Sequence, residues 1–428
     1  MIPTTSQMRG AGRQGGMRER ENDRVVVIGA GLAGLTAAAT AARAGKEVVV
    51  IEAHREGGRA RTDQRGGYLF NQGPHALYRG GPAWRILRAL GVAHHGHNPP
   101  LRGMRGVRDA RLVPLLRSGQ VATLTTRIAT GRPTEWAGRS ASEWVDSLSL
   151  RREAADLVRT FVRVATYVAD LDRLPATIAL AQLRSALVRG VSYLDGGWRT
   201  LVTGLATAAT EAGSVIRPHT AAVGIGGGPG GWEVLTTNDE RLCAGAVVVA
   251  AGGPTSVRNL LPFDPGWGEL GPEVTAACLD LGLRAGRPPI VFGLDAPLYL
   301  SPHSPPGDLA PKGGSLVHVL RYGARDADTD RDELRALARL VGATEEQVAE
   351  ERFLSRMVVS HALPSPEQGL HGRPGVSVNG APGLFIAGDW VGPVGWLADA
   401  SMASGQSAAL LAADPAGQTR RPRRVRAA

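Results

Sequence analysis

The segment 24–52 constrains the fold more than any other part of the chain. Residues 25–28 and 48–51 are runs of β-branched residues, the pattern of parallel strands that are buried on both faces. Between them, the alanine-rich stretch 32–44 favours a helix, and Gly45 stands where helices commonly end with glycine. The sequence therefore predicts a complete strand–helix–strand unit.

A glycine-rich turn, Gly-Ala-Gly-Leu-Ala-Gly, joins the first strand to the helix. Gly29 allows a tight turn, Gly31 lets the backbone approach a pyrophosphate, and Gly34 lets the helix pack closely on the strand. Leu32 and Ala33 complete the turn and begin the helix, whose N-terminus directs unpaired N–H groups toward phosphates. The turn predicts a phosphate-binding site.

Glu52 ends the second strand, 18 residues beyond Gly34. Its carboxylate can accept hydrogen bonds from ribose hydroxyls. Because both strands, the helix and the acid are all in place, a dinucleotide site is favoured over a simple glycine-rich turn. The unit alone does not separate NAD from FAD.

The next residues, 52–61, read Glu-Ala-His-Arg-Glu-Gly-Gly-Arg-Ala-Arg. Here the chain resembles the flavin superfamily of monoamine oxidases, protoporphyrinogen oxidases and phytoene desaturases, in which a Gly-Gly-Arg stretch wraps FAD. The resemblance implies that Gly58, Arg59 and Arg61 line the cofactor. An arginine there can neutralise pyrophosphate charge, and the alternative for both arginines is a solvated loop.

A second similar segment begins with Gly-Gly-Trp at 196–198 and continues with an expected helix over 201–212 and a strand around Val223. The resemblance implies that the backbone of Val223 holds the adenine. Ordinary α/β core is an equally good interpretation of this residue. The apolar run 246–250 matches the superfamily's later buried strand.

A third similar segment, Gly-Leu-Phe-Ile-Ala-Gly-Asp-Trp, begins at residue 383. The resemblance implies a strand that delivers Gly388 and Asp389 to FAD, where the carboxylate bonds a ribityl hydroxyl or reaches the pyrophosphate through water. Trp396 and Leu397 then open a helix whose N-terminus would face the O2 and N1 side of the flavin ring. A positive helix end there stabilises the anionic reduced flavin.

The three segments are separated by long insertions. We therefore expect an α/β fold with an α+β substrate part, in which a Rossmann-like FAD-binding domain of the glutathione-reductase type is interleaved with a substrate domain. The expected FAD-binding domain comprises 24–81, 195–264 and 371–412. The expected substrate domain comprises 82–194 and 265–370.

Three smaller expectations concern the substrate domain and the chain ends. Residues 82–200 are expected to be largely helical, and Ser301–Lys312 to be a loop. The ends, 1–23 and 413–428, are expected to be disordered tails.

The superfamily takes a hydride, or its equivalent, from a C–H bond, and the protein positions that bond near flavin N5. Its amine oxidases usually place a lysine against N5 through water, whereas the only distal lysine here, Lys312, stands in an expected loop. The Gly-Asp pair at 388–389 resembles phytoene desaturases and hydroxysqualene dehydroxylases more closely. We expect an enzyme that oxidises the carbon skeleton of a small lipophilic substrate, with an amine oxidase as the open alternative.

Two histidines are candidates for a role in the reaction. His75 follows Gly-Pro in a loop that the superfamily places near the flavin ring, and it could be a base or a hydrogen-bond partner of the ring. A satisfied structural histidine is the other interpretation. His361 is a weaker candidate of the same kind.

Composition limits the remaining partners. The net charge is +10, but seven of these positive charges lie in residues 1–24 and 418–428, so nucleic-acid binding is not expected. The two cysteines make neither a disulfide framework nor a metal cluster, and neither lies in the third segment. We therefore expect a reducing cytoplasm, no metal and non-covalent FAD. The electron acceptor is not identified by the sequence.

A peripheral membrane contact is a further possibility for a lipophilic substrate. A small apolar face could be formed by Trp84, Ile86, Leu87 and Leu90, assisted by the basic C-terminal tail. The alternative is that these four residues form the internal face of a helix. No run of apolar residues is long enough to span a membrane.

Overall fold

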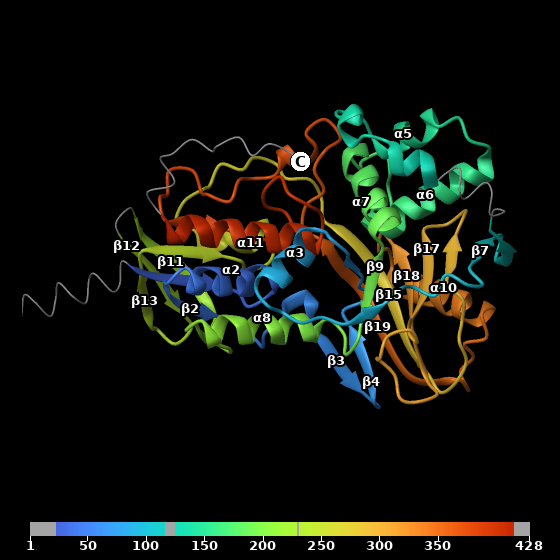
Figure 1. Ribbon diagram of the computed structural model, residues 1–428, viewed down its shortest axis with the longest axis horizontal. Coiled ribbons are helices and arrows are strands. Elements are labelled where there is room, and N and C mark those ends of the chain that lie inside the picture. Colours follow the sequence, from blue (N-terminus) through green and yellow to red (C-terminus); the bar gives the residue numbers. More distant parts are fainter. Residues whose placement is uncertain (1–22, 116–124, 229–230, 415–428) are drawn as a thin grey trace, which may run out of the picture.

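The structure is a computed structural model that describes residues 23–115, 125–228 and 231–414. Figure 1 shows two bodies side by side along the long axis, each built around a sheet. One is a parallel sheet between helices, and the other is a larger mixed sheet beneath a group of helices. None of the helices in the described part of the chain is long and apolar enough to cross a membrane.

The first sheet has five parallel strands in the order β10-β2-β1-β14-β20. Three widely separated parts of the chain supply them: β1 (Arg24–Ile28), β2 (Glu47–Ile51), β10 (Val215–Arg217), β14 (Ala246–Val249) and β20 (Leu384–Ile386). The β-branched strands are buried on both faces of the sheet. Successive residues of one strand therefore pack into two different hydrophobic cores. Val25 and Val27 pack under helices, whereas Val26 and Ile28 face the opposite layer.

Helices cover one face of this sheet and a small antiparallel sheet covers the other. The helical layer consists of α2 (Leu32–Arg43), α3 (Pro82–Ala89), α8 (Arg199–Glu211) and α11 (Ala398–Ala413). The opposite layer consists of β11 (Ala222–Gly228), β12 (Gly231–Thr236), β13 (Arg241–Ala244) and α9 (Pro254–Leu260). The expected strand–helix–strand unit is therefore present, with its helix ending one residue earlier than predicted.

The second sheet has seven strands in the order β19-β15-β18-β17-β16-β7-β8. Their bounds are β7 (Arg105–Arg108), β8 (Arg111–Pro114), β15 (Val274–Leu283), β16 (Val291–Gly293), β17 (Leu298–Ser304), β18 (Ser315–Tyr322) and β19 (Val348–Ser360). Alternation along β15 separates its two faces. Leu279 and Leu281 pack toward α10 (Ala327–Leu340), whereas Ala276 and Cys278 face the other side, which we call the inner face.

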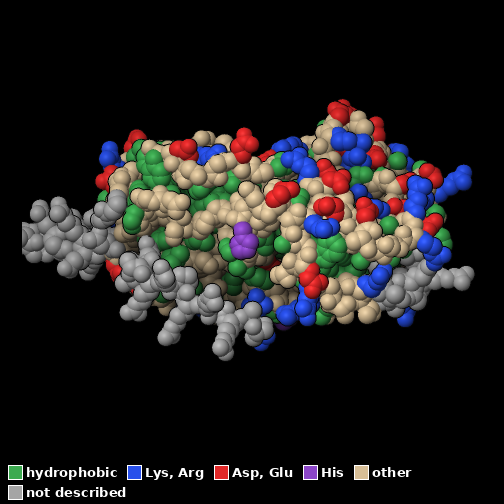
Figure 2. All heavy atoms as spheres, turned by 90° about the horizontal axis from the view of Figure 1, so that it is seen from above, with side chains coloured by type: hydrophobic (Ala, Val, Ile, Leu, Met, Phe, Trp, Pro, Cys, Tyr) green, Lys and Arg blue, Asp and Glu red, His purple; other side chains and the backbone are tan. Residues whose placement is uncertain are grey.

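Helices α5 (Ala141–Ser147), α6 (Arg152–Thr166) and α7 (Ala176–Arg189) lie over the inner face (Figure 1). Phe161 and Val164 of α6 pack against Cys278 and Phe292 of the sheet. Acidic and basic side chains are interspersed over this end of the molecule in the view of Figure 2.

Short strands connect the two bodies. The hairpin of β3 (Thr62–Arg65) and β4 (Tyr68–Asn71) follows the 3-10 turn η1 (Gly58–Ala60). A small sheet pairs β9 (Val191–Leu194) with β5 (Leu77–Tyr78) and β6 (Gly96–His97). The remaining 3-10 turns are η2 (Pro133–Trp136) and η3 (Gly369–Gly372).

Two expectations for the substrate part were wrong in part. Residues 82–200 are not largely helical, because 96–114 contribute β6, β7 and β8. Residues 301–304 continue β17 and do not belong to a loop. The other interpretation of Trp84, Ile86, Leu87 and Leu90, an internal helix face, is confirmed: Ile86, Leu87 and Leu90 are at most 5% exposed and Trp84 packs against the same core.

The contact between α11 and α2 predicts a glycine requirement. A Cβ at Gly405 would lie 2.2 Å from the carbonyl oxygen of Ala33, so Gly405→Ala would force the two helices apart. We expect a loss of about 1–3 kcal/mol in the free energy of unfolding, measured by urea denaturation. Gly224→Ala on β11 is the matched control, because its Cβ would meet no atom within 4 Å. Equal effects of the two substitutions would contradict this packing.

Candidate functional site

The glycine turn between β1 and α2 has the geometry that its sequence predicts. Gly29 has φ +104°, and a Cβ there would lie 2.5 Å from the carbonyl oxygen of Ala250. A Cβ at Gly34 would lie 1.9 Å from Gly29 O, so close packing requires glycine at that position. Gly31 differs, because its Cβ would meet no atom within 4 Å. The turn therefore presents open space at Gly31.

The N-terminus of α2 faces this space without a side-chain cap. Gly31 is the N-cap residue, and the first backbone bond of the helix runs from Leu35 N to Gly31 O. The N–H groups of Leu32, Ala33 and Gly34 precede that bond, so they are free to bind an anion.

Glu52 holds the turn as well as ending β2. Its Oε2 accepts a hydrogen bond of 2.7 Å from Ala30 N, and its Oε1 accepts one of 3.0 Å from His54 N. Sequence reasoning assigned this carboxylate to a ribose and missed its bond to the turn. A carboxylate has about four lone-pair sites, so both partners can be accommodated.

The Gly-Gly-Arg loop lies directly against the same turn. Gly57 N donates to Ala30 O at 2.8 Å, and a Cβ at Gly58 would lie 3.7 Å from Gly31 Cα. Gly57 and Gly58 both have positive φ, which other residues rarely adopt. This loop is the second wall of the space at Gly31.

Arg59, Asp389 and His361 meet although they are far apart in the sequence. The Oδ1 of Asp389 accepts hydrogen bonds from Arg59 Nη2 at 2.5 Å and from His361 Nδ1 at 2.8 Å, while its Oδ2 accepts one from His361 N. Burial opposes ionisation, but the Arg59 charge and the His361 hydrogen bond hold the pKa of Asp389 well below its usual range. The guanidinium of Arg59 is thus paired with a carboxylate of the protein itself.

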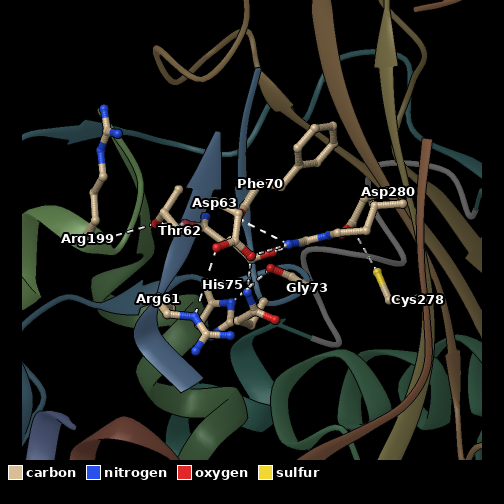
Figure 3. A network of polar contacts seen from close by, with 12 residues as sticks. Arg61, Thr62, Asp63, Phe70, Gly73, His75, Arg199, Cys278 and Asp280 are labelled. Atoms are coloured by element: carbon tan, nitrogen blue, oxygen red, sulfur yellow. Dashed lines mark hydrogen bonds and ion pairs between the residues drawn. The ribbon is translucent and has the colours of Figure 1, made fainter. Parts of the chain in front are cut away.

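Arg61 points into a different network, shown in Figure 3. Its Nε is buried, has no hydrogen-bond partner among the residues that the structure describes, and lies 4.0 Å from Asp63 Oδ1. Burial opposes ionisation of Asp63, but a hydrogen bond from Gln72 and the charge of Arg55 lower the pKa of this carboxyl. Arg61 is therefore the arginine of the loop with donors to spare.

Arg352 joins this network to the inner face of the second sheet. Its Nη1 donates to Asp63 Oδ2 at 3.2 Å, and its Nε donates to Asp280 Oδ2 at 2.9 Å. The other oxygen of Asp280 accepts from His318 Nδ1 at 2.6 Å and from the Cys278 thiol at 3.0 Å. Burial would raise the pKa of Asp280, but His318 and Arg352 lower it. The carboxylate is fully buried and its charge is compensated.

His75 lies between these two networks. Its loop rests on the second sheet, because a Cβ at Gly73 would lie 2.5 Å from Met357 Sδ and 4.0 Å from Cys278 Sγ. Its ring packs on Trp198 with a centroid distance of 4.6 Å, and its Nδ1 lies 2.8 Å from Gly73 O. A carbonyl can only accept, so Nδ1 carries the proton and Nε2 of the neutral ring has the lone pair. Burial lowers the pKa of His75 to about 4.

Five of the six tyrosines of the chain gather around this region. Burial raises the pKa of all five: Tyr78, Tyr167, Tyr193, Tyr299 and Tyr322. Tyr167 donates to Pro74 O, next to His75, and its ring meets Tyr322 edge to face at 5.8 Å. Sequence reasoning missed this group, because its members come from five separate elements.

The remaining predicted residues fall into two places. Gly388 N donates to Ser404 Oγ of α11 at 3.0 Å, and Trp396 Nε1 donates to Thr166 O at the end of α6. Leu397 has φ +55° and is the N-cap residue of α11. Val223 is half-exposed at a bulge in β11, so its backbone is released from the strand ladder. Trp396 thus contacts the helices of the second body, whereas Val223 lies on the small sheet of the first.

These features fit a dinucleotide with an extended ring system. The free N–H groups of α2 and the space at Gly31 suit a pyrophosphate. The strand ends that carry Glu52 and Asp389 lie at the same edge of the parallel sheet, where α/β folds bind their ligands.

Comparison with known proteins agrees with this assignment. An L-amino-acid oxidase of Crotalus adamanteus is 51% identical over 55 residues, which is 13% of this chain and only 11% of that protein. An oxidoreductase from Methanosarcina mazei has a similar structure, with a TM-score of 0.73, 19% identity, and coverage of 90% of this chain and 99% of that one. Cyclohexylamine oxidase from Brevibacterium oxydans gives a TM-score of 0.67 at 15% identity, over 92% and 99% of the two chains.

The two structural likenesses confirm the expected α/β fold with an FAD-binding and a substrate part. The model of the FAD-dependent oxidoreductase family matches residues 24–393. The predictions of an enzyme and of FAD as its cofactor are therefore confirmed, and the match is consistent with the expected flavin superfamily. The chain belongs to the family of FAD-dependent oxidoreductases.

Proposed function

We propose that the chain removes a hydride, with FAD as acceptor, from a C–H bond of an uncharged and largely apolar small molecule. The substrate lies beside His75, against the inner face of the seven-stranded sheet. The observation that carries this proposal is the uncharged character of His75 and of the five tyrosines around it, which offer aromatic contacts to a substrate.

The titratable groups around His75 support a neutral substrate. His75 itself is uncharged at pH 7, because burial lowers its pKa to about 4. The five tyrosines are uncharged too, because burial raises their pKa. The Asp280 carboxylate is compensated by Arg352 and His318. An ammonium or carboxylate group of a substrate would find no opposite charge among these side chains.

The positions of the two lysines also favour this proposal. Lys46 pairs with Asp23 on the outer surface, and Lys312 is exposed in the loop between β17 and β18. Neither can be the lysine that flavin amine oxidases place against N5. Carbon oxidation is therefore preferred to amine oxidation.

In this proposal the space at Gly31 and the region beside His75 would hold FAD, which would supply a hydride acceptor. Thirteen residues of the turn, the Gly-Gly-Arg loop and the C-terminal segment hold it, together with the backbone of Val223 at the adenine. They are Gly29, Gly31, Leu32, Ala33, Gly34, Glu52, Gly58, Arg59, Arg61, Gly388, Asp389, Trp396 and Leu397. Arg59 acts by positioning Asp389, and Arg61 adds positive charge beside the same loop.

His75 supplies the acceptor that a desaturation needs. Such a reaction breaks two C–H bonds, sending a hydride to FAD and a proton to an acceptor while a C=C bond forms. Nε2 of His75 has a lone pair, because Nδ1 carries the proton bonded to Gly73 O. It can therefore accept a hydrogen bond or the departing proton.

An amine oxidase that takes its substrate uncharged is the second candidate. The edge-to-face pair of Tyr167 and Tyr322 gives the region an aromatic surface on which an uncharged amine can pack. One of the proteins with a similar structure is a cyclohexylamine oxidase. The aromatic lining alone suits both a neutral amine and an apolar carbon skeleton.

Anaerobic reduction of the bound flavin separates these candidates. We expect polyenes or squalene-like lipids to bleach the visible flavin absorbance, and primary amines to leave it unchanged. Bleaching by amines alone would favour the second candidate, and no reduction by either class would contradict both.

The two glycines of the turn should respond differently to the same substitution. Gly31→Ala places a methyl group in open space, so the apoprotein should keep its unfolding midpoint while FAD affinity falls about tenfold or more. Gly34→Ala collides with Gly29 O and should lower the midpoint itself. FAD titration by fluorescence and thermal unfolding measure the two effects. Unchanged FAD affinity of Gly31→Ala would contradict the placement of the cofactor.

His75 should affect turnover without affecting the cofactor. We expect His75→Leu to lower kcat about 10²–10⁴-fold with full FAD occupancy, and His75→Gln, which keeps an acceptor, to lose less. Because protonation below a pKa of about 4 removes the lone pair, the rate due to this group should be flat from pH 6 to 8 and fall toward pH 4. Wild-type kcat in His75→Leu would show that His75 is structural.

A further inference from the structure

Two buried side chains of opposite charge flank the N-terminal end of α11. Asp399 stands in the first turn of the helix and is 7% exposed. Arg373 is also 7% exposed, and its Nη1 donates to Gly395 O at 3.0 Å, two residues before the helix N-cap. The reaction proposed above uses neither of them.

Arg373 is a buried cation without a carboxylate of its own. Its guanidinium lies over the ring of Trp396 at 4.9 Å, and its Nε and Nη2 have no hydrogen-bond partner among the described residues. The nearby Asp389 acts on it through space but is already paired with Arg59. Burial lowers the pKa of Arg373 only to about 10, so it stays charged at neutral pH. An uncompensated buried charge is unfavourable, so a bound negative charge would stabilise it.

Asp399 lies between the N-termini of two helices. Its Oδ1 accepts a hydrogen bond of 2.8 Å from Ala83 N in the first turn of α3, and its carboxylate closely approaches Gly81. Arg85 on α3 and Tyr78 on β5 are the titratable groups on neighbouring elements that interact with it. Burial raises the pKa of Asp399 to about 6.

The start of α11 is close to the substrate site. Gly405 packs against Ala33 at the N-terminus of α2, and α11 begins seven residues earlier, about 10 Å further along its axis. There Trp396 bonds to Thr166 O, and the next residue, Tyr167, bonds to Pro74 O beside His75. A flavin ring that lies next to His75 is therefore near both buried charges.

We propose that Asp399 and Arg373 tune, in opposite directions, the reduction potential of the flavin ring bound beside His75. This inference rests on the proposed function, because it needs the ring in that place. Two-electron reduction leaves negative charge on the flavin. In a site of low dielectric, the Arg373 cation stabilises that charge and the Asp399 anion destabilises it.

The same arrangement couples the potential to pH. Above about pH 6 Asp399 is ionised and its negative charge opposes reduction of the flavin. Below that pH the carboxyl is protonated, so this opposition disappears. The contribution of Asp399 to the potential is therefore present at pH 8 and lost as the pH falls toward 5. Arg373 keeps its charge across this range.

The test is the midpoint potential of the bound FAD, measured by equilibration with reference dyes in the full-length holoenzyme. Asp399→Asn removes the charge but keeps an oxygen for Ala83 N, and Arg373→Met keeps an apolar group over Trp396. At pH 8 we expect a higher potential in Asp399→Asn and a lower one in Arg373→Met. Each substitution should change the equilibrium constant for two-electron reduction of the bound FAD at least tenfold. This change corresponds to a shift of about 30 mV in the midpoint potential. At pH 5 Asp399→Asn should match the wild type.

A control separates this effect from a general change of charge. Asp239→Asn removes the same charge from an exposed turn, where Asp239 already has φ +58°, and should leave the potential unchanged. If one of the two variants fails to fold, the other still tests the inference, because the direction of its expected shift in potential is stated in advance. Unchanged potentials, or shifts of the same sign, in variants with full FAD occupancy would overturn this inference alone. Failure of Gly31→Ala to weaken FAD binding would instead overturn the cofactor placement beneath it.

Discussion

The buried ion pair between Arg352 and Asp280 is the interaction on which the arrangement of the site depends. Arg352 comes from β19 of the second sheet, yet it also reaches Asp63 and the backbone of Asn71 in the hairpin that follows the Gly-Gly-Arg loop. Both members of the pair are desolvated, so removal of one would leave an uncompensated buried charge, at about 3–5 kcal/mol. This network fixes the position of the Gly73–His75 loop on the inner face.

A second buried carboxylate performs the same task on the side of the parallel sheet. Asp389 binds Arg59 of the Gly-Gly-Arg loop and His361 at the end of β19. The space at Gly31 and the aromatic region around His75 are thus held by two compensated carboxylates, one from each body. In both, the fold compensates the buried carboxylate internally, and the N–H groups at the start of α2 stay available for a phosphate.

Much of the cofactor part was predictable because its signals are local. The β-branched runs, the spacing of Gly29, Gly31 and Gly34, and the position of Glu52 all fall within 30 residues of chain. The substrate part was less predictable. Short strands at 96–114 lack a clear period, and the bond between Arg59 and Asp389 joins residues 330 positions apart. The tyrosines meet only through tertiary packing, so no spacing could have indicated them. The boundaries proposed for the two interleaved domains stay predictions.

The measurement that tests this account most directly is a crystal structure of the chain with FAD bound. The account predicts the pyrophosphate over Gly31 at the N-terminus of α2 and the flavin ring in contact with the His75 loop, with Nε2 of His75 open to the substrate space. A pyrophosphate bound elsewhere, or a flavin ring separated from His75 by protein, would contradict it.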